Sequence, residues 1–250
     1  MMRKLEFEKV IILKTTADGS FTLYNPDLDE QYHSMNGAVQ ESKHVYIEAG
    51  LIHYINKNNS NRKKDHKVQQ HEIYLLELGF GTGLNAYLTA LEAEKQKIKI
   101  RYVALEKFPL SQDITNQLNY SDENRLLFQQ IHQSGWGNSV SINKYFDLQK
   151  LEIDFFEFNF PDFYDLVFYD AFAPDKQPEV WSQELFDKLF FSMNSGGILT
   201  TYCAKGIVRR MMLQAGFTVE RIPGASGKRE MLRANALKNT NSNKEKKEYH

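Results

Sequence analysis

The run from Leu75 to Asn85, with the sequence LLELGFGTGLN, constrains the fold of this chain more than any other stretch. The apolar segment Ile73 to Leu78 is typical of a buried strand, and it leads into glycines at positions 79, 81 and 83. Glycine lets the backbone turn tightly and approach a ligand without a Cβ in the way. Helical spacing begins at Leu84, so we expect free backbone N–H groups at a helix N-terminus and a nucleotide-type cofactor cradle. A glycine turn without a ligand is the alternative.

The spacing of the glycines points to one class of cofactor. It is G-x-G-x-G instead of G-x-G-x-x-G, and an acid, Glu77, lies two residues before the first glycine. This variant resembles the S-adenosylmethionine loop of Rossmann-like methyltransferases. Because that cofactor lacks a phosphate, we expect close backbone approach and carboxylate contacts to matter more than the helix dipole. The cofactor-binding residues expected in this segment are Glu77, Gly79, Phe80, Gly81, Thr82, Gly83 and Asn85.

Strand-like and helix-like segments alternate along the rest of the chain. Strands are predicted near residues 73–78, 98–106, 139–146, 164–169, 197–202, 217–222 and 230–234, with a short strand or a loop at 151–156. Helices are predicted near residues 84–96, 110–132, 178–191 and 207–215. This alternation predicts an α/β fold of the Rossmann-like methyltransferase type, with a mostly parallel seven-stranded sheet and helices on both faces.

The chain is expected to have three parts. Residues 1–56 would form an N-terminal extension with a β-hairpin and a helix, residues 70–235 the methyltransferase domain, and residues 236–250 a disordered tail. The single cysteine, Cys203, excludes an internal disulfide framework and is expected in the core, and no apolar run reaches membrane-spanning length. These features predict a cytoplasmic protein. The seven histidines form no metal motif, so no metal site is expected.

Acids end several predicted strands, at the edge where open α/β sheets bind their ligands. Glu106 follows the last glycine of the loop by 23 residues, close to the spacing of an acid that binds ribose hydroxyls. Its neighbour Lys107 is included among the cofactor-binding residues. Asp154 is expected to hydrogen-bond an adenine amino group from the end of the third strand. An exposed carboxylate at the end of a strand is the alternative for Glu106, and the strand before Asp154 is itself weakly indicated.

Asp170 closes an apolar strand and opens the loop DAFAPDKQPEVW. A buried strand that delivers a carboxylate into such a loop places it near the transferred methyl group. Methyl transfer to nitrogen needs a neutral amine, whereas a carboxylate beside an amine favours the ammonium form. We therefore expect Asp170 to be the catalytic residue, to contact the cofactor, and to bind and orient the amine, with proton loss to it or to water as a later step. A loop-capping aspartate is the alternative.

The charges of this nearly neutral chain, with a formal net charge of −1, are segregated. Residues 152–175 contain seven acids and no Lys or Arg, whereas residues 205–233 contain seven basic residues and two acids. This pattern suggests a polyanionic partner held through its phosphates, although solvated helix faces would give the same pattern. The candidate substrate- or tRNA-binding residues are Lys205, Arg209, Arg210, Lys228 and Arg229, and those for stacking on a base are Trp136 and Trp181.

Together, these stretches resemble the methyltransferase domain of the bifunctional tRNA 5-methylaminomethyl-2-thiouridine biosynthesis enzyme over about residues 32–233. The motifs are GFGTGLN (79–85), EKFPL (106–110), DAFAPDKQPEVW (170–181), GIVRR (206–210), AGFTV (215–219) and GKREML (227–232). The resemblance implies that Glu77 and the glycines hold the methionine end of S-adenosylmethionine, Glu106 the ribose and Asp170 the aminomethyl nitrogen. It implies methylation of 5-aminomethyl-2-thiouridine at the tRNA wobble position. Tyr32 and Glu41 also fit the family pattern, without an assigned role.

The bifunctional enzyme continues into a flavin-dependent oxidase, which this chain is too short to contain. We therefore expect a stand-alone methyltransferase with tRNA as its partner and a functional link to a separate flavin oxidase or another enzyme that forms the aminomethyluridine. Two other functions remain open. One is a small-amine methyl- or aminopropyltransferase of the same fold. The other is a non-catalytic protein that binds the cofactor or tRNA, against which the intact set Glu77, Glu106 and Asp170 argues.

Overall fold

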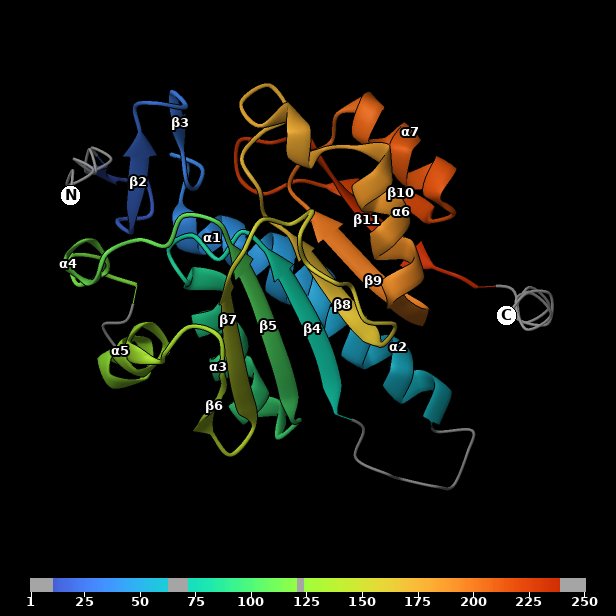
Figure 1. Cartoon of the computed structure of the whole chain (residues 1–250), viewed down its shortest axis with the longest axis horizontal. Helices are drawn as coiled ribbons and strands as arrows, with labels where there is room; N and C mark the ends of the chain where they lie inside the picture. Colours follow the sequence, from blue (N-terminus) through green and yellow to red (C-terminus); the bar gives the residue numbers. More distant parts are fainter. Residues whose placement is uncertain (1–10, 63–71, 121–123, 239–250) are drawn as a thin grey trace, which may run out of the picture.

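The computed structural model describes residues 11–62, 72–120 and 124–238, and its main feature is an eight-stranded sheet in the order β10-β11-β9-β8-β4-β5-β7-β6. The five strands from β9 to β7 are parallel, and β10, β11 and β6 pair antiparallel at the two edges (Figure 1). The strands are β4 (Ile73–Leu78), β5 (Ile100–Glu106), β6 (Ser139–Asn143), β7 (Phe146–Glu152), β8 (Tyr164–Tyr169), β9 (Met193–Thr201), β10 (Thr218–Pro223) and β11 (Glu230–Ala236). The predicted α/β fold with a mostly parallel sheet is confirmed.

The sheet has eight strands where the sequence predicted seven, because the segment after residue 138 folds into a hairpin of two strands. The chain reverses after Asn143, whose side-chain oxygen accepts a hydrogen bond of 2.8 Å from the backbone of Tyr145. In β7, buried positions alternate with polar ones, and one buried position is Lys150. Because polar residues interrupt the apolar ones in β7, the sequence contains no continuous apolar run that would indicate this strand.

Helices cover both faces of the sheet. They are α1 (Ala38–Ser42), the π-helix η1 (Lys43–Ile52), α2 (His53–Arg62), α3 (Leu84–Gln96), α4 (Gln112–Thr115), α5 (Arg125–Gln133), the 3₁₀ turn η2 (Pro178–Val180), α6 (Gln183–Ser192) and α7 (Gly206–Ala215). The buried apolar residues form two clusters. Residues of η1, α3 and α5 belong to one cluster, and residues of α6 and α7 belong to the other (Figure 1). Neighbouring residues of β4 divide accordingly, since Leu75 faces the first cluster and Leu76 the second.

Two predicted helices have different limits in the structure. The helix expected over residues 110–132 is two helices, α4 and α5, and the helix expected from Pro178 begins at Gln183. Ser182 sets that start, because its side chain accepts a hydrogen bond from the backbone N–H of Leu185. The predicted end of α7 is correct, since Gly216 has a φ of 111°.

The N-terminal segment contributes a small antiparallel sheet of three strands. They are β1 (Ile12–Thr15), β2 (Phe21–Asn25) and β3 (Glu30–Gln31). Most of the predicted tail, residues 239–250, lies outside the described residues, and Ala236 still belongs to β11. Within the described ranges, none of the helices has the length and apolar character needed to cross a membrane.

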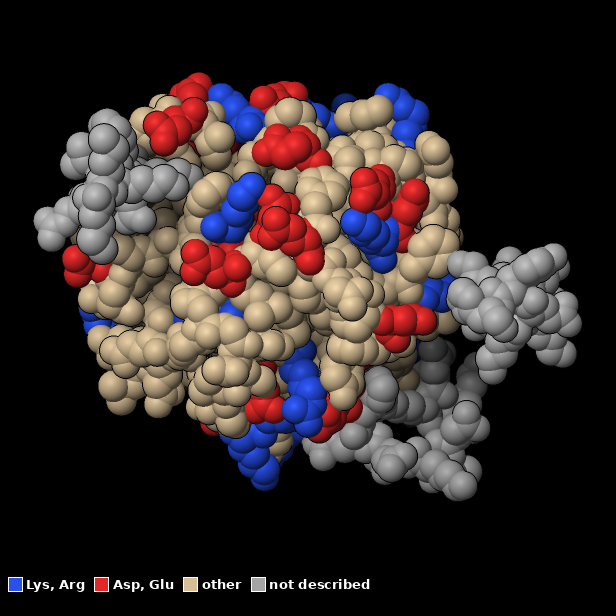
Figure 2. Space-filling model, in the orientation of Figure 1, with Lys and Arg blue, Asp and Glu red and all other residues tan. Residues whose placement is uncertain are grey.

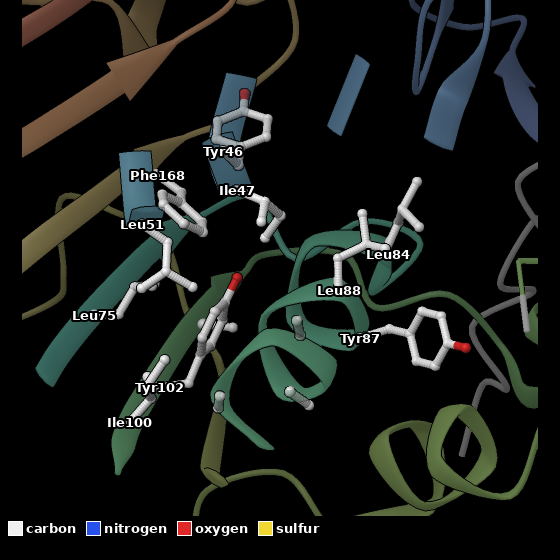
Figure 3. Packing of buried hydrophobic residues seen from close by; sticks show 14 of the residues in the cluster. Tyr46, Ile47, Leu51, Leu75, Leu84, Tyr87, Leu88, Ile100, Tyr102 and Phe168 are labelled. Carbon is white, nitrogen blue, oxygen red and sulfur yellow. The ribbon is translucent and has the colours of Figure 1, made fainter. Parts of the chain in front are cut away.

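The π-helix η1 packs unusually close to the sheet at Gly50. A Cβ at this position would lie 3.0 Å from a ring carbon of Phe168 and 3.2 Å from the hydroxyl oxygen of Thr200. The side chains of Tyr46 and Leu51 lie against the same strand region (Figure 3). The small residue at position 50 therefore determines how near η1, and Tyr46 with it, can come to β8.

We predict that Gly50→Leu destabilises the fold by about 1–3 kcal/mol, because the added side chain overpacks the contact between η1 and the sheet. The measurement is the free energy of unfolding in urea. The control is Lys43→Leu, at an exposed position of the same helix, which should stay within about 0.5 kcal/mol of the wild type. Equal effects of the two substitutions would contradict the close packing described here.

Candidate active site

A cavity of about 620 Å³ lies where the central parallel strands end. Its lining brings together seven of the residues singled out in the sequence, namely Gly79, Gly81, Glu106, Lys107, Asp154, Asp170 and Lys228. They come from the ends of β4, β5, β7 and β8 and from the loop between β10 and β11. The N-terminal segment closes the cavity with Tyr32 and Glu41, among others. The topology therefore gathers residues that lie up to 149 positions apart, as the rule for open α/β sheets requires.

The glycine loop approaches the backbone of the neighbouring strand end. At Gly79, φ is 93°, and a Cβ would lie 2.5 Å from the carbonyl oxygen of Asp170. At Gly81, a Cβ would lie 3.2 Å from the ring of Tyr32. Both positions thus require glycine, for space as well as for backbone conformation.

Several backbone N–H groups of the glycine loop, before the start of α3, are used within the protein. Those of Gly79 and Phe80 donate to the carbonyl of Leu105 at 3.0 and 3.1 Å, and that of Gly81 donates to Oε2 of Glu106 at 3.0 Å. The reason is that the loop folds against the end of β5. Cofactor contacts must therefore come mainly from shape and from side chains.

Five expected cofactor-binding residues lie outside the lining of the cavity, namely Glu77, Phe80, Thr82, Gly83 and Asn85. The ring of Phe80 packs edge-on against His132 and Trp136. The hydroxyl of Thr82 lies 3.3 Å from Nε2 of His33, whose pKa burial lowers to about 4. These residues support the loop from beneath, so direct contact with a cofactor stays a prediction.

Two carboxylates flank the wall of the cavity formed by β5 and β7. Glu106 also accepts a hydrogen bond of 2.9 Å from the backbone of Phe108, so its carboxylate is fixed relative to the glycine loop. Asp154 accepts a hydrogen bond of 2.7 Å from Lys107, which holds the pKa of the Asp154 carboxyl below its usual value. A pair of oriented carboxylates suits hydroxyl and amino groups of a nucleoside.

Asp170 is the most perturbed acid of the lining. Burial raises the pKa of its carboxyl to about 7, although two hydrogen bonds oppose this rise. Tyr46 donates to Oδ1 at 2.6 Å, and Nδ2 of Asn85 donates to Oδ2 at 2.7 Å. A carboxyl with a pKa near neutrality can bind a cation when ionised and can also accept a proton.

Glu77 lies behind this group, because it is fully buried and does not line the cavity. Its Oε1 accepts a hydrogen bond of 2.9 Å from the same amide nitrogen of Asn85. Burial raises the pKa of Glu77 well above its usual value. Among the described residues, Oε2 of Glu77 and Oδ1 of Asn85 have no hydrogen-bond partner. The structure thus connects Glu77 to the cavity through Asn85 and Asp170.

The five candidate tRNA-binding residues differ in their exposure and partners. Lys228 points into the cavity, where it pairs with the buried Glu41 at 2.5 Å and lies 4.1 Å from the ring centroid of Tyr202. Lys205 pairs with Asp175, and Arg209 is partly buried. Arg210 and Arg229 are exposed. On the face shown in Figure 2, acidic and basic side chains are interspersed.

The two tryptophans do not line the cavity. Trp181 is buried and donates to the carbonyl of Phe172 at 2.7 Å, and Trp136 packs against Phe80. The aromatic side chains of the lining come from five other residues, namely Tyr32, Phe108, Phe155, Phe172 and Tyr202. Cys203 is buried, and no cluster of three His, Cys, Asp or Glu suited to a metal ion occurs within residues 11–62, 72–120 and 124–238.

Sequence reasoning missed Tyr46 altogether and left Glu41 without a role. Tyr46 is one aromatic residue in an apolar helix, and its partner Asp170 is 124 residues away. The only local feature that marks Glu41 in the sequence is its position beside an apolar stretch with few other acidic residues. Neither residue could be paired with its partner without the fold.

The residues of the cavity fit S-adenosylmethionine. The glycines leave a space that a Cβ would fill, Glu106 offers carboxylate oxygens to ribose hydroxyls, and buried polar atoms of Glu77 and Asn85 are left without partners. No phosphate has to be bound, which agrees with a loop whose N–H groups are already used.

Comparison with known proteins gives the same picture. Residues 145–237 match a family model described as S-adenosyl-L-methionine-dependent methyltransferase. The chain is 29% identical over 229 residues to the tRNA 5-methylaminomethyl-2-thiouridine biosynthesis bifunctional protein MnmC of Leptospira interrogans, covering 87% of the chain and 34% of that protein. It is 30% identical over 244 residues to the protein of the same name of Pseudoalteromonas translucida, covering 86% and 34%. The chain therefore spans about a third of the length of these relatives.

A solved structure supports the fold. The crystal structure of MnmC2 from Aquifex aeolicus superposes with a TM-score of 0.74 at 24% sequence identity, covering 97% of this chain and 76% of that one. The comparisons confirm the predicted resemblance to these relatives, the methyltransferase fold and S-adenosylmethionine as its cofactor. The individual roles of the site residues stay predictions.

We predict that Gly79→Ala lowers the affinity for S-adenosylmethionine by more than about 10-fold, because the new Cβ meets the carbonyl of Asp170. The measurement is isothermal titration with the cofactor. Gly196→Ala is the matched control, because Gly196 also has a positive φ, 86°, but nothing lies within 4 Å of its Cβ position. Both variants should lose about 1–2 kcal/mol of stability from backbone strain, Gly79→Ala should lose more because of the clash, and only Gly79→Ala should lose binding. Equal binding by both would refute the cradle.

We predict that Asp170→Asn stabilises the fold at pH 8 and not at pH 4. The folded-state pKa of about 7 lies above the ordinary 3.8, so the stability of the wild type falls as the pH rises from about 4 through 7. The asparagine removes this loss, which is on the order of 2–4 kcal/mol. Urea unfolding at several pH values measures it, with Asp162→Asn, whose side chain is 76% exposed, as the control. A gain independent of pH would contradict the buried carboxyl.

Proposed function

We propose that the protein transfers the methyl group of S-adenosylmethionine to the exocyclic amine of 5-aminomethyl-2-thiouridine at the wobble position of tRNA. One observation carries this proposal: a buried carboxyl, Asp170, shares a single cavity with the glycine loop and Glu106. The names of the relatives give the substrate, since they are tRNA 5-methylaminomethyl-2-thiouridine biosynthesis proteins. Arg210 and Arg229 are exposed and available for phosphates of the tRNA backbone.

In the proposed reaction the cofactor and the residues of the cavity have different roles. When bound, S-adenosylmethionine supplies a methyl group on a sulfonium, and the residues of the cavity supply position and proton transfer. An aliphatic amine is largely protonated at neutral pH, so it enters as an ammonium that ionised Asp170 can bind. The ammonium must lose a proton before its lone pair can attack the methyl carbon.

Asp170 is suited to take part in this loss. Its pKa of about 7 lets it hold a proton at neutral pH, and the ammonium of Lys228 pairs with Glu41 in the same cavity. A second cation close to the bound amine favours the neutral form of that amine. The lone pair of the amine nitrogen then forms the N–C bond while the C–S bond breaks and its electrons stay on sulfur. The product is a secondary ammonium, which leaves in that form or passes its extra proton to water, and an Asp170 that accepted the first proton releases it to water before the next cycle.

The pocket also accounts for selection of a base that leaves the anticodon stack. Phe108 is 52% exposed, and it lines the cavity together with Tyr32. Aromatic side chains at such an entrance can stack on a splayed base. A tRNA substrate implies action in the cytoplasm. Such a substrate also requires another active site that forms the aminomethyl group of the uridine, and we propose a flavin oxidase for this role.

We predict that the protein labels tRNA when incubated with radioactive S-adenosylmethionine and bulk tRNA from cells that lack this modification step. Nucleoside mass spectrometry should place the label in 5-methylaminomethyl-2-thiouridine. Asp170→Asn should lower kcat/KM by at least about 100-fold, because it cannot bind the ammonium or accept its proton. Asp162→Asn is the control and should keep full activity.

Other outcomes decide between the alternatives. Label in a different nucleoside would keep the cofactor and overturn the substrate. Label in small amines and none in tRNA would favour a small-amine transferase, and charge reversal of Arg209 and Arg210 would then leave activity unchanged. Cofactor binding without turnover on any of these substrates would favour a non-catalytic protein.

A further inference from the structure

We propose that Tyr46 is a positioning residue of the methyl-transfer reaction, which holds the Asp170 carboxyl in place and stays hydrogen-bonded when that carboxyl takes up a proton. The inference rests on the proposed function, since it concerns the acid that the amine would meet. Tyr46 belongs to the N-terminal helix η1, outside the strands and loops that form the cofactor cradle. No motif in the sequence assigned it a role.

The geometry begins with a buried phenol between two acceptors. The hydroxyl of Tyr46 lies 2.6 Å from Oδ1 of Asp170 and 3.3 Å from the carbonyl oxygen of Tyr169, and its residue is 1% exposed. A hydroxyl has one proton to donate, so the shorter contact takes it while Asp170 is ionised. The ring packs at 5.2 Å from that of Phe168, which fixes the direction of the hydroxyl (Figure 3).

The second acceptor matters once Asp170 is protonated. The hydroxyl can then rotate to donate to the carbonyl of Tyr169 and can accept the new proton of Asp170 through its own lone pair. Neither group is left without a partner in either state, which avoids the cost of a buried unsatisfied polar atom. Tyr46 therefore supports both states that a proton-accepting Asp170 passes through.

The other oxygen of Asp170 is held from the opposite side. Asn85, at the start of α3, donates through one nitrogen to Oδ2 of Asp170 and to Oε1 of Glu77. One donor on each oxygen fixes the plane of the carboxyl, and the remaining lone pairs are left for an amine in the cavity. The amide nitrogen of Asn85 can only donate a hydrogen bond, whereas the hydroxyl of Tyr46 can donate or accept one, so Tyr46 is the partner that can adapt.

Several charged or titratable groups surround this carboxyl besides Tyr46. They come from several neighbouring elements, and they are Glu41 of α1, Glu77 of β4, Tyr102 of β5, Tyr202 after β9 and Lys228 of the loop between β10 and β11. The Tyr46 hydrogen bond is the largest influence that lowers the pKa of Asp170 against burial. Its loss should therefore raise the pKa of Asp170 further above its ordinary value.

Tyr46→Phe tests the proposal through the pH profile of kcat/KM for tRNA methylation. The acidic limb should move up by about one pH unit, so that activity falls about 5-fold at pH 7 and returns toward the wild-type value at pH 9. The fall in unfolding free energy with rising pH should extend to higher pH by the same amount, and this second measurement needs no substrate.

Tyr54→Phe is the matched control. Tyr54 follows in α2, is buried, and donates at 2.8 Å to Oδ1 of Asp165, an aspartate at the other end of the same strand β8. It should lose stability to a similar degree without any change in the shape of either pH curve. A merely structural role for Tyr46 would make the two variants alike.

The two proposals fail in different ways. If the unfolding curve of Tyr46→Phe follows that of the wild type at every pH, or if its activity falls equally at all pH values, the role given to Tyr46 is wrong. If the wild type puts no label into tRNA, the proposed function is wrong, and the unfolding curves still decide whether Tyr46 controls the protonation of Asp170.

Discussion

The site depends on one interaction, the pair of hydrogen bonds that holds the Asp170 carboxyl where β8 leaves the sheet. A buried carboxylate costs several kcal/mol unless donors replace the water it has lost. Those donors can reach it only if other elements pack closely around the end of the strand. The small residue Gly50 lets η1 bring Tyr46 near, and the missing Cβ of Gly79 lets the glycine loop lie against the backbone of Asp170. The close packing of these elements is therefore also what places the hydrogen-bond donors on the Asp170 carboxyl.

The arrangement has a cost in stability that the rest of the fold has to offset. Burial raises the pKa values of both Glu77 and Asp170, so each carboxyl favours its neutral form inside the protein. Since two nearby negative charges repel each other, ionising both at once is disfavoured, and the more deeply buried Glu77 keeps its proton while Asp170 titrates. Of these two carboxyls, Asp170 lines the cavity, and its titration lowers the stability of the folded state.

The sequence predicted the parts of this structure that depend on local pattern. The strand 73–78 and the glycine end of α7 agree with the structure, because apolar periodicity and a left-handed glycine are local signals. The rule for parallel strands brought Glu106, Asp154 and Asp170 to one cavity. What the pattern could not supply were pairings across the chain. Tyr46 gave no signal of its own, and the polar residues of β7 concealed a hairpin.

The basic segment, residues 205–233, shows that basic residues close together in the sequence need not all be exposed on the surface of the protein. Lys228 lies within it, yet it pairs with Glu41, 187 residues away, and helps to close the cavity instead of facing solvent. Arg210 and Arg229 are the members that face outward. In the proposed reaction the two kinds of residue would have different tasks. The outer arginines would act on the tRNA backbone, whereas Lys228 and Asp170 would act on the amine inside the cavity. Because Lys228 belongs to the loop between β10 and β11 and Glu41 to the N-terminal segment, the amine end of the cavity forms only when both ends of the described chain pack together.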